Sequence, residues 1–305
     1  GTLSPSKVSD YKVAIALAKK HEVPIVLDPV GCHAGAYRLS VVLDLIKTGE
    51  ISLVRGNQSE IKAIYDALSP NTQADASTTG KGVDGGQVED SAVIAYRLSR
   101  LINCPVVATG EEDYVSDGTR VFAVPHGHPI MAAVTGTGCL LGAVLAAFFS
   151  AYYPCKNRLS IGEFLAYALA YYGLAGESAV QVSGVKPGSF SVAFMDSLYT
   201  LDDAVLMSEN HIRPIVVPDQ LQVYFISGTQ DVELNESRLL STVEDACRGG
   251  VTCFQFREKG VGTLEGQQKL ELAQQLKQIC AKYNVLFVIN DDVDLAMAVN
   301  ADGVH

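Results

Sequence analysis

The feature that most constrains this fold is the alternation of short apolar runs with helix-like segments along the first two-thirds of the 305-residue chain. The runs are VPIVLDPVG at residues 23–31, ISLVRGN at residues 51–57 and CPVVATG at residues 104–110, each ending in Gly, Asp, Thr or Asn. Residues 37–46 and 91–101 have the length and composition of helices. This pattern is typical of a doubly wound parallel sheet of the α/β class.

Polar side chains follow these predicted strands where each strand ends. Ligands of doubly wound sheets bind beyond the carboxyl ends of the strands. We therefore expect Asp28, Arg55, Asn57 and Thr109 to face one crevice. Residues 69–86 are rich in Ser, Thr, Asn, Asp and Gly, and this composition predicts a long loop.

The composition favours a globular protein. Hydrophobic residues make up 48% of the chain and charged residues 19%, far from the pattern of disordered chains. The net charge of -11 argues against nucleic acid or an anionic membrane as a general partner. No apolar stretch is long enough to span a bilayer. Seven cysteines without metal-site spacing predict free thiols in the cytoplasm.

A proline-containing break predicts a second domain. It follows a helical stretch at residues 199–207, and we expect a first domain at residues 1–207, a linker at residues 208–221 and a second domain at residues 222–305. Predicted strands follow as VYFIS at residues 223–227, VTCFQF at residues 251–256 and VLFVI at residues 285–289. Leu272, Leu276, Ile279, Cys280 and Tyr283 form an apolar helical stripe. The pattern matches the opening units of a (β/α)8 barrel, whose usual length is roughly 250 residues. Because the chain starts without Met and stops inside an expected strand, we expect a fragment cut at both ends.

The stretch VTGTGCLLGAVLAAF at residues 134–148 carries the sharpest local signal. A glycine turn that opens a helix directs backbone N–H groups and the positive end of the helix dipole toward one point, so Gly136 and Gly138 could form an anion hole. Cys139, at the same helix start, would have a lowered thiol pKa. Small residues at this point also suit tight packing where a strand turns into a buried helix. Spacing alone leaves both interpretations open.

Five motifs in order extend this signal over the first domain. They are DPVG at residues 28–31, RGNQSE at residues 55–60, TGEEDYVSDG at residues 109–118, GHPIM at residues 127–131 and TGTGC at residues 135–139. YGLAGE at residues 172–177 and PGSFSVAFMDSLY at residues 187–199 agree with them. Together they resemble hydroxyethylthiazole kinase, of the ribokinase-like family, over residues 1 to about 207.

The resemblance implies transfer of a phosphoryl group from ATP, with Mg²⁺, to the primary hydroxyl of 4-methyl-5-(2-hydroxyethyl)thiazole. Such transfer depends on positioning and on charge neutralisation, which an anion hole at Gly136 and Gly138 supplies. Cys139 occupies the place of the aspartate base of most ribokinase-like kinases, so the resemblance places its thiol near the substrate hydroxyl. The resemblance also implies a homo-oligomer, a trimer, in which a neighbouring subunit contributes to the thiazole pocket.

Four further residues match family positions with a function. Arg55 and Thr109 match positions that contact ATP, and Asp28 and Glu60 match acidic positions linked to magnesium and phosphate. Three of them have a plainer alternative: a surface ion pair for Arg55, a strand-end cap for Thr109 and an ordinary turn for Asp28. His33 departs from the family, because it places a bulky ring where a glycine lets backbone approach the ligand.

The second domain resembles the first part of thiamine-phosphate synthase, a (β/α)8 barrel. The motifs are VYFISGTQD at residues 223–231, QFREK at residues 255–259 and INDDVDLAMAVNADGVH at residues 289–305. Gln255, Arg257 and Lys259 alternate at a strand end and should point to one side, which suits the pyrophosphate of a pyrimidine pyrophosphate. A solubilised edge strand is the alternative. The resemblance implies that Asn290 contacts the same substrate and that Asp291 binds Mg²⁺.

Asp292 departs from the arginine common in that family and adds negative charge beside the expected pyrophosphate site. The second metal-binding acid and the phosphate loops of the family lie beyond His305. We therefore expect no thiamine phosphate synthesis from this chain alone.

The sequence thus predicts a bifunctional enzyme of thiamine biosynthesis or salvage. Its kinase product, thiazole phosphate, would be coupled to hydroxymethylpyrimidine pyrophosphate, giving thiamine phosphate and pyrophosphate. One alternative is a thiazole-binding or assembly protein of the same fold without catalysis. Another is a sugar or pyrimidine kinase of that fold, which the cysteine in TGTGC and the synthase-like segment make less favourable.

Overall fold

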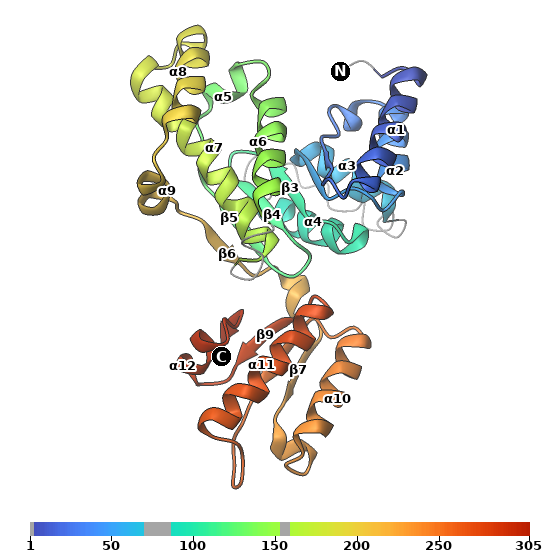
Figure 1. The fold of residues 1–305 in the computed structure, drawn as a ribbon, viewed down its shortest axis with the longest axis vertical. Coiled ribbons are helices and arrows are strands. Elements are labelled where there is room, and N and C mark those ends of the chain that lie inside the picture. The colour runs from blue at the N-terminus through green and yellow to red at the C-terminus, as the bar shows by residue number, and fades with distance from the viewer. Residues whose placement is uncertain (1–2, 70–86, 153–158) are drawn as a thin grey trace. The chain divides into compact units, whose positions relative to one another are not determined.

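The computed structural model of the chain describes residues 3–69, 87–152 and 159–305 (Figure 1). Most of the predicted loop at residues 69–86 lies outside the described residues. The chain divides into two compact units, Gly1–Ile215 and Val216–His305.

The first unit contains a sheet flanked by helices. Its described helices are α1 (Pro5–Lys20), α2 (Ala36–Ile46), α3 (Gln58–Leu68), α4 (Gln87–Ile102), α5 (Ile130–Ala133), α6 (Thr137–Ala151), α7 (Ile161–Ser183), α8 (Pro187–Thr200) and α9 (Asp203–Glu209). Its described strands are β1 (Val26–Leu27), β2 (Leu53–Asn57), β3 (Val106–Thr109), β4 (Asp113–Ser116), β5 (Val121–Val124) and β6 (Arg213–Ile215). The three predicted strands are thus confirmed as β1, β2 and β3.

The first sheet is mixed rather than wholly parallel. Its order is β1-β2-β3-β4-β5-β6. β1, β2 and β3 pair in parallel, as predicted, whereas β3 to β6 pair antiparallel. The connections at residues 110–112 and 117–120 are too short for the crossover that a parallel pair requires, so β4 and β5 fold back as hairpins.

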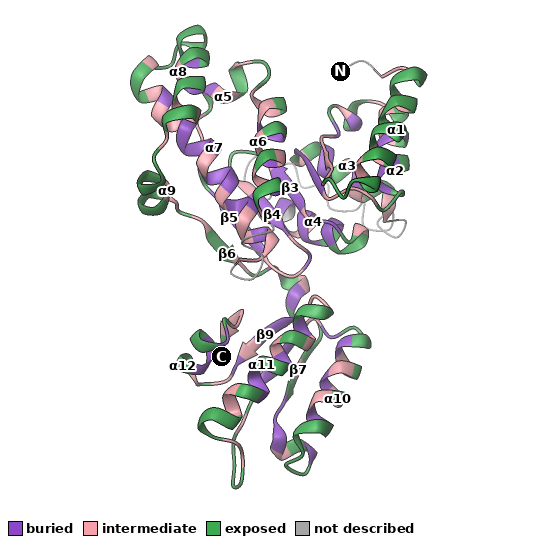
Figure 2. Ribbon diagram, in the orientation of Figure 1, coloured by how far each residue is buried: buried purple, intermediate pink, exposed green. Residues whose placement is uncertain are grey.

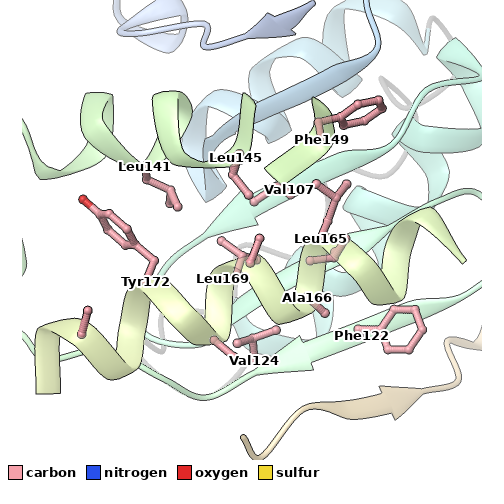
Figure 3. Close-up of a cluster of buried hydrophobic side chains, with 14 of the residues drawn as sticks. Val107, Phe122, Val124, Leu141, Leu145, Phe149, Leu165, Ala166, Leu169 and Tyr172 are labelled. Atoms are coloured by element: carbon pink, nitrogen blue, oxygen red, sulfur yellow. The ribbon is translucent and has the colours of Figure 1, made fainter. Parts of the chain in front are cut away.

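The sheet has one apolar core on each face, because neighbouring residues of a strand point to opposite faces. Leu53 and Val107 belong to the core that α6, α7 and α8 cover, whereas Val54 and Val106 belong to the core under α2, α3 and α4. Figure 3 shows side chains of α6 and α7 meeting those of the strands in the first of these cores. Figure 2 shows β3 and β5 as buried, while α1 has no buried residue.

Two corrections concern the end of the first unit. The helical stretch predicted at residues 199–207 is divided between α8 and α9, because Asp202 caps α9 and its carboxylate accepts from the Ala204 N–H at 2.8 Å. β6, within the predicted linker, pairs with β5 of the first sheet. The domain limits from the sequence stay predictions.

The second unit is built from βα repeats. Its strands are β7 (Tyr224–Ser227), β8 (Cys253–Phe256), β9 (Leu286–Ile289) and β10 (Gly303–Val304), and its helices are α10 (Glu236–Arg248), α11 (Gly266–Lys282) and α12 (Val293–Ala298). All neighbouring strands pair in parallel, in the order β10-β9-β8-β7. The predicted stripe packs on the sheet, with Leu272, Leu276 and Cys280 fully buried. This confirms the predicted opening of a (β/α)8 barrel.

Candidate active site

A cleft of about 850 Å³ lies in the first unit at the carboxyl ends of β2 and β3. Its lining includes Arg55, Thr109, Gly138, Tyr172 and the loop from His126 to Pro129. This is the position in which parallel strands present polar residues to a ligand. The cleft therefore brings together Arg55, Thr109 and Gly138 of the predicted site.

Arg55 is the central cation of the cleft. It belongs to the same sheet face as Leu53 and is buried, with 8% of its surface exposed. Its Nη1 donates to Asp28 Oδ2 at 3.1 Å and its Nη2 donates to Thr109 Oγ1 at 3.3 Å, while its Nε has no hydrogen-bond partner. The surface ion pair that the sequence left open is thus excluded. A buried guanidinium with donor capacity to spare suits a phosphate.

Asp28 lies beside Arg55 with one oxygen unused. Its Oδ1 is buried and has no hydrogen-bond partner. Burial raises the pKa of the Asp28 carboxyl, the Arg55 charge lowers it, and the Glu60 charge raises it. An orphaned carboxylate oxygen in a site of mixed charge is chemically suited to a hard cation such as Mg²⁺.

Glu60 has a structural task at the start of α3. Its Oε2 accepts from the Asn57 N–H at 2.8 Å, and Asn57 Oδ1 accepts from the Glu60 N–H at 2.8 Å, which completes a capping box at the start of α3. Glu60 Oε1 accepts from the Gly31 N–H at 2.7 Å. Glu60 thereby ties the turn after β1 to the turn after β2, and it is buried.

The TGTGC segment opens α6 after the short helix α5, not after a strand. Gly136 is the N-cap with φ of 101°, a backbone conformation that glycine adopts without strain, and no side chain caps this helix. The Thr137 N–H donates to the Val134 carbonyl at 3.5 Å, and the N–H groups of Gly138 and Cys139 in the first turn are available to an anion. A Cβ on Gly138 would lie 3.5 Å from Arg55 Nη2, so the guanidinium sits directly against this turn.

Cys139 is exposed in the first turn of α6 and is not among the residues that line the cleft. The other described cysteines, at positions 32, 104, 247, 253 and 280, are buried. Burial raises the pKa of the Cys32 thiol to about 11. Of these described thiols, Cys139 is the most accessible to a substrate.

Tyr172 is a site residue without an assigned role in the sequence reasoning, although it lies in the YGLAGE motif. Its hydroxyl donates to the Thr137 carbonyl at 2.6 Å and so fixes the start of α6. Burial raises its pKa, and its hydroxyl lies within electrostatic reach of Arg55 and Cys139. Only the packing of α7 against α6 brings it there (Figure 3).

Asp113, at the start of β4, is a second residue that sequence reasoning missed. Its Oδ1 accepts from the Gly110 N–H at 2.9 Å, which closes the turn after β3 at the edge of the cleft. Burial raises the pKa of Asp113 to about 7. His33, by contrast, is exposed in a 3-10 turn at Cys32–Ala34 and does not line this cleft.

In the second unit, the predicted residues separate into two groups. Gln255 is buried in β8, and its Nε2 donates to the Tyr224 hydroxyl at 3.2 Å. β8 ends at Phe256, so Arg257 and Lys259 lie beyond the strand rather than along it. Lys259 forms an ion pair with Asp291, which holds the pKa of that carboxyl below its usual range.

Two more residues follow β9. The Asn290 N–H donates to the Phe256 carbonyl at 3.0 Å, which places this residue at the same end of the sheet as Lys259. Asp292 caps α12, and its Oδ2 accepts from Lys269 Nζ at 2.7 Å. The extra negative charge is thus paired with Lys269, which lowers the pKa of Asp292.

Within the described residues, no cluster of three or more His, Cys, Asp or Glu side chains could hold a metal by itself. A metal at Asp28 would need ligands from a substrate or from water, as Mg²⁺ in phosphoryl-transfer sites usually has. No helix among the described residues has the length and apolar character to cross a membrane.

Comparison with known proteins agrees with both units. The model of the hydroxyethylthiazole kinase family matches residues 1–204, and the model of thiamine monophosphate synthase matches residues 223–305. A hydroxyethylthiazole kinase of Streptococcus agalactiae serotype Ia is 42% identical over 210 residues, which are 68% of this chain and 77% of that protein. The thiamine biosynthesis bifunctional protein ThiM/ThiE of Symbiobacterium thermophilum is 34% identical over 313 residues, covering 100% of this chain and 60% of that protein.

One solved structure supports the fold of the first unit. The structure of a hydroxyethylthiazole kinase protein from Pyrococcus horikoshii OT3 superposes with a TM-score of 0.60 at 30% identity. The match covers 71% of this chain and 75% of that one.

Proposed function

The chain belongs to the hydroxyethylthiazole kinase family and carries a thiamine monophosphate synthase segment after it, and from this we propose that its first unit phosphorylates 4-methyl-5-(2-hydroxyethyl)thiazole with ATP. The observation that carries the proposal is the buried Arg55 guanidinium, held between Asp28 and Thr109 beneath the uncapped start of α6. A fixed cation and a helix start that converge on one point favour phosphoryl transfer, in which negative charge develops on the leaving phosphate.

Each predicted residue has a place in this proposal. Arg55 and Thr109 contact the ATP phosphates, and the N–H groups of the turn at Gly136 and Gly138 form the anion hole. Cys139, in the same turn, lies near the substrate hydroxyl and accepts its proton.

Mg²⁺ fits the first unit at Asp28, whose Oδ1 is the buried oxygen without a partner. Glu60 contributes negative charge nearby, although both of its oxygens already accept backbone N–H groups. When bound, the ion neutralises phosphate charge. Arg55 would also neutralise phosphate charge, so this chain supplies both a carboxylate for the ion and a guanidinium for the phosphate.

The second unit would act on the kinase product. We place the pyrimidine pyrophosphate at Gln255, Arg257, Lys259 and Asn290, with Mg²⁺ at Asp291. The ion pair of Lys259 with Asp291 supports this, because it brings a phosphate-binding cation and a metal-binding carboxylate to one point. The coupling of thiazole phosphate to the pyrimidine, as in a bifunctional enzyme, is a proposal for the longer protein rather than for this segment.

The proposal also covers the cellular compartment and the oligomeric state of the enzyme. The described cysteines are free thiols, which supports a reducing cytoplasm. We also propose that the chain forms a homo-oligomer, a trimer. Val192, Met195 and Tyr199 on α8 are exposed apolar side chains, and these are common at subunit contacts. Sedimentation of the purified chain measures the oligomeric state directly.

Replacement of Cys139 tests the kinase assignment. In the purified chain, Cys139→Ala should lower kcat for thiazole phosphorylation by about 10²- to 10⁴-fold, the usual contribution of a general base, with KM for ATP little changed. Ser150→Ala, at the exposed far end of the same helix, is the matched control and should keep full activity.

Two results would contradict parts of this proposal. A wild-type chain that binds the thiazole without phosphorylating it would support the binding protein. Equal kcat in Cys139→Ala and wild type would remove Cys139 from the mechanism.

A further inference from the structure

The connection between β5 and α5, residues 125–129 and here called the wall loop, forms one side of the cleft. His126, Gly127, His128 and Pro129 line the cleft directly. Gly127 has φ of 124°, so the loop bends sharply there. Any ligand in the cleft must therefore meet backbone that this loop positions.

His126 fastens the wall loop to α7 and to the segment before β6. Only 5% of its side chain is exposed. Its Nδ1 lies 3.1 Å from Glu177 Oε1 on α7, and its Nε2 accepts from the His211 N–H at 3.0 Å. Because a backbone N–H can only donate, Nε2 must be unprotonated, and the ring proton is at Nδ1, from which it donates to Glu177.

Glu177 holds the next residue of the loop as well. The Gly127 N–H donates to the same Oε1 at 2.8 Å. One carboxylate oxygen thus fixes both the ring of His126 and the backbone of a residue that lines the cleft. The wall loop is therefore tied to α7 at two consecutive residues through a single atom.

The face of α7 that packs against the loop carries glycines, which allow the loop to approach closely. A Cβ on Gly173 would lie 2.5 Å from His126 Cβ and 2.7 Å from the His126 carbonyl carbon, and a Cβ on Gly176 would lie 2.5 Å from Met131 Sδ. Positions 173, 176 and 177 share one face of the helix. Gly173 lets the loop close on α7, Gly176 leaves room for Met131 of α5, and the Glu177 carboxylate beside them sets the position of the loop.

We propose that His126 is a positioning residue for the nucleotide side of the cleft, acting through Glu177 and the backbone of His211 on the wall loop. The inference rests on the proposed function, because it takes ATP as the ligand of the cleft. A positioning residue of this kind affects how well ATP is bound, whereas Cys139 affects the chemical step.

A graded series of variants tests this. His126→Asn keeps a donor near the place of Nδ1, His126→Gln keeps an acceptor near the place of Nε2, and His126→Ala keeps neither. His126→Ala should raise KM and Kd for ATP about tenfold and change kcat by less than about twofold, and the Asn and Gln substitutions should give smaller increases. Glu177→Gln, which keeps an acceptor oxygen, should retain more ATP affinity than Glu177→Ala.

The matched control is His21→Ala, at the exposed C-cap of α1, which should bind ATP as wild type does. ATP affinity is measured by equilibrium binding as well as by turnover. Wild-type chain without ATP affinity would overturn the proposed function and this inference with it. Equal ATP affinity in wild type and His126→Ala would overturn this inference alone. If His126→Ala does not fold, wild-type ATP affinity in both His126→Asn and Glu177→Ala would overturn it equally.

Discussion

Removal of the Arg55 charge should destabilise the first unit in a pH-dependent way. Arg55→Met keeps most of the side-chain volume and removes the partner of Asp28. Burial already raises the pKa of Asp28, and the Arg55 charge opposes that rise, so the variant should have a still higher Asp28 pKa. A carboxyl with a raised folded-state pKa lowers stability as pH rises from its unfolded value, about 4, through the folded value. The cost of Arg55→Met should therefore be smallest near pH 4 and should increase as pH rises through the raised pKa of Asp28.

The size of the effect follows from the burial of the pair. Loss of one partner of a buried ion pair costs about 3–5 kcal/mol. The Asp28 side chain is 21% exposed, so we expect the lower limit, about 3 kcal/mol at pH 8. The double variant Arg55→Met with Asp28→Asn leaves no unpaired charge and should recover much of that loss.

The assay is urea unfolding of the first unit at pH 5 and pH 8 for wild type, both single variants and the double variant. Phosphorylation is measured in parallel, where the loss of two charge-assisted donors should lower kcat/KM for ATP by about 10²- to 10³-fold. Arg55→Lys, which keeps the charge but not the fork, is the control for stability. Equal destabilisation at both pH values, or a double variant no more stable than Arg55→Met, would refute the reasoning.

Two further predictions concern the cleft walls. Gly173→Ala should raise KM for ATP at least about tenfold, because the added methyl meets His126 backbone that can only move away, while Gly188→Ala, with open space around its Cβ, should not. Unchanged ATP kinetics in Gly173→Ala would show that the wall loop is not fixed there. Asp113→Asn keeps an acceptor for the Gly110 N–H and should reduce the fall in stability between about pH 4 and pH 7, since the raised pKa of about 7 binds a proton in the folded state over that range. Urea unfolding at several pH values measures this slope, and an unaltered slope would contradict the assignment.

The part of the site on parallel strands could be predicted from sequence. Arg55 and Thr109 each lie at the end of an apolar run, and the ends of neighbouring parallel strands meet at one edge of the sheet. The observed register places Asn57 opposite Thr109 and so brings the two ends level. Helix starts were equally readable, since Asn57 and Glu60 have the spacing of a capping box.

Contacts between distant segments could not be predicted. His126 and Glu177 are 51 residues apart, and their contact depends on where α7 packs, which no local pattern specifies. The spacing of Gly173, Gly176 and Glu177 was the available signal, because glycines on one helix face indicate a close approach. β6 was missed because Pro214 indicates a break, yet a proline is tolerated in an edge strand such as this one.

The effect of the aspartate at position 292, where an arginine is common, also depends on tertiary structure. An aspartate where an arginine is common suggests a changed pyrophosphate site. In the structure, Lys269 Nζ on α11 donates to Asp292 Oδ2 at 2.7 Å and neutralises that charge, although the two residues are 23 positions apart in sequence. The change in local charge at the expected pyrophosphate site is therefore smaller than the aspartate at position 292 alone suggests.

The two opposed cores of the first sheet limit how this site can change during evolution. Side chains along β2 alternate between the two faces, as Leu53, Val54 and Arg55 do. A single residue inserted in β2 before them would therefore move the guanidinium to the core under α2 and α3. It would also expose an apolar residue to the cleft. Substitutions can alter the chemistry of the cleft step by step, but insertions and deletions in β2 or β3 cannot be accepted singly. In a comparison of lineages, length variation in this unit should therefore fall in the connections and never within the strands that carry Arg55 and Thr109.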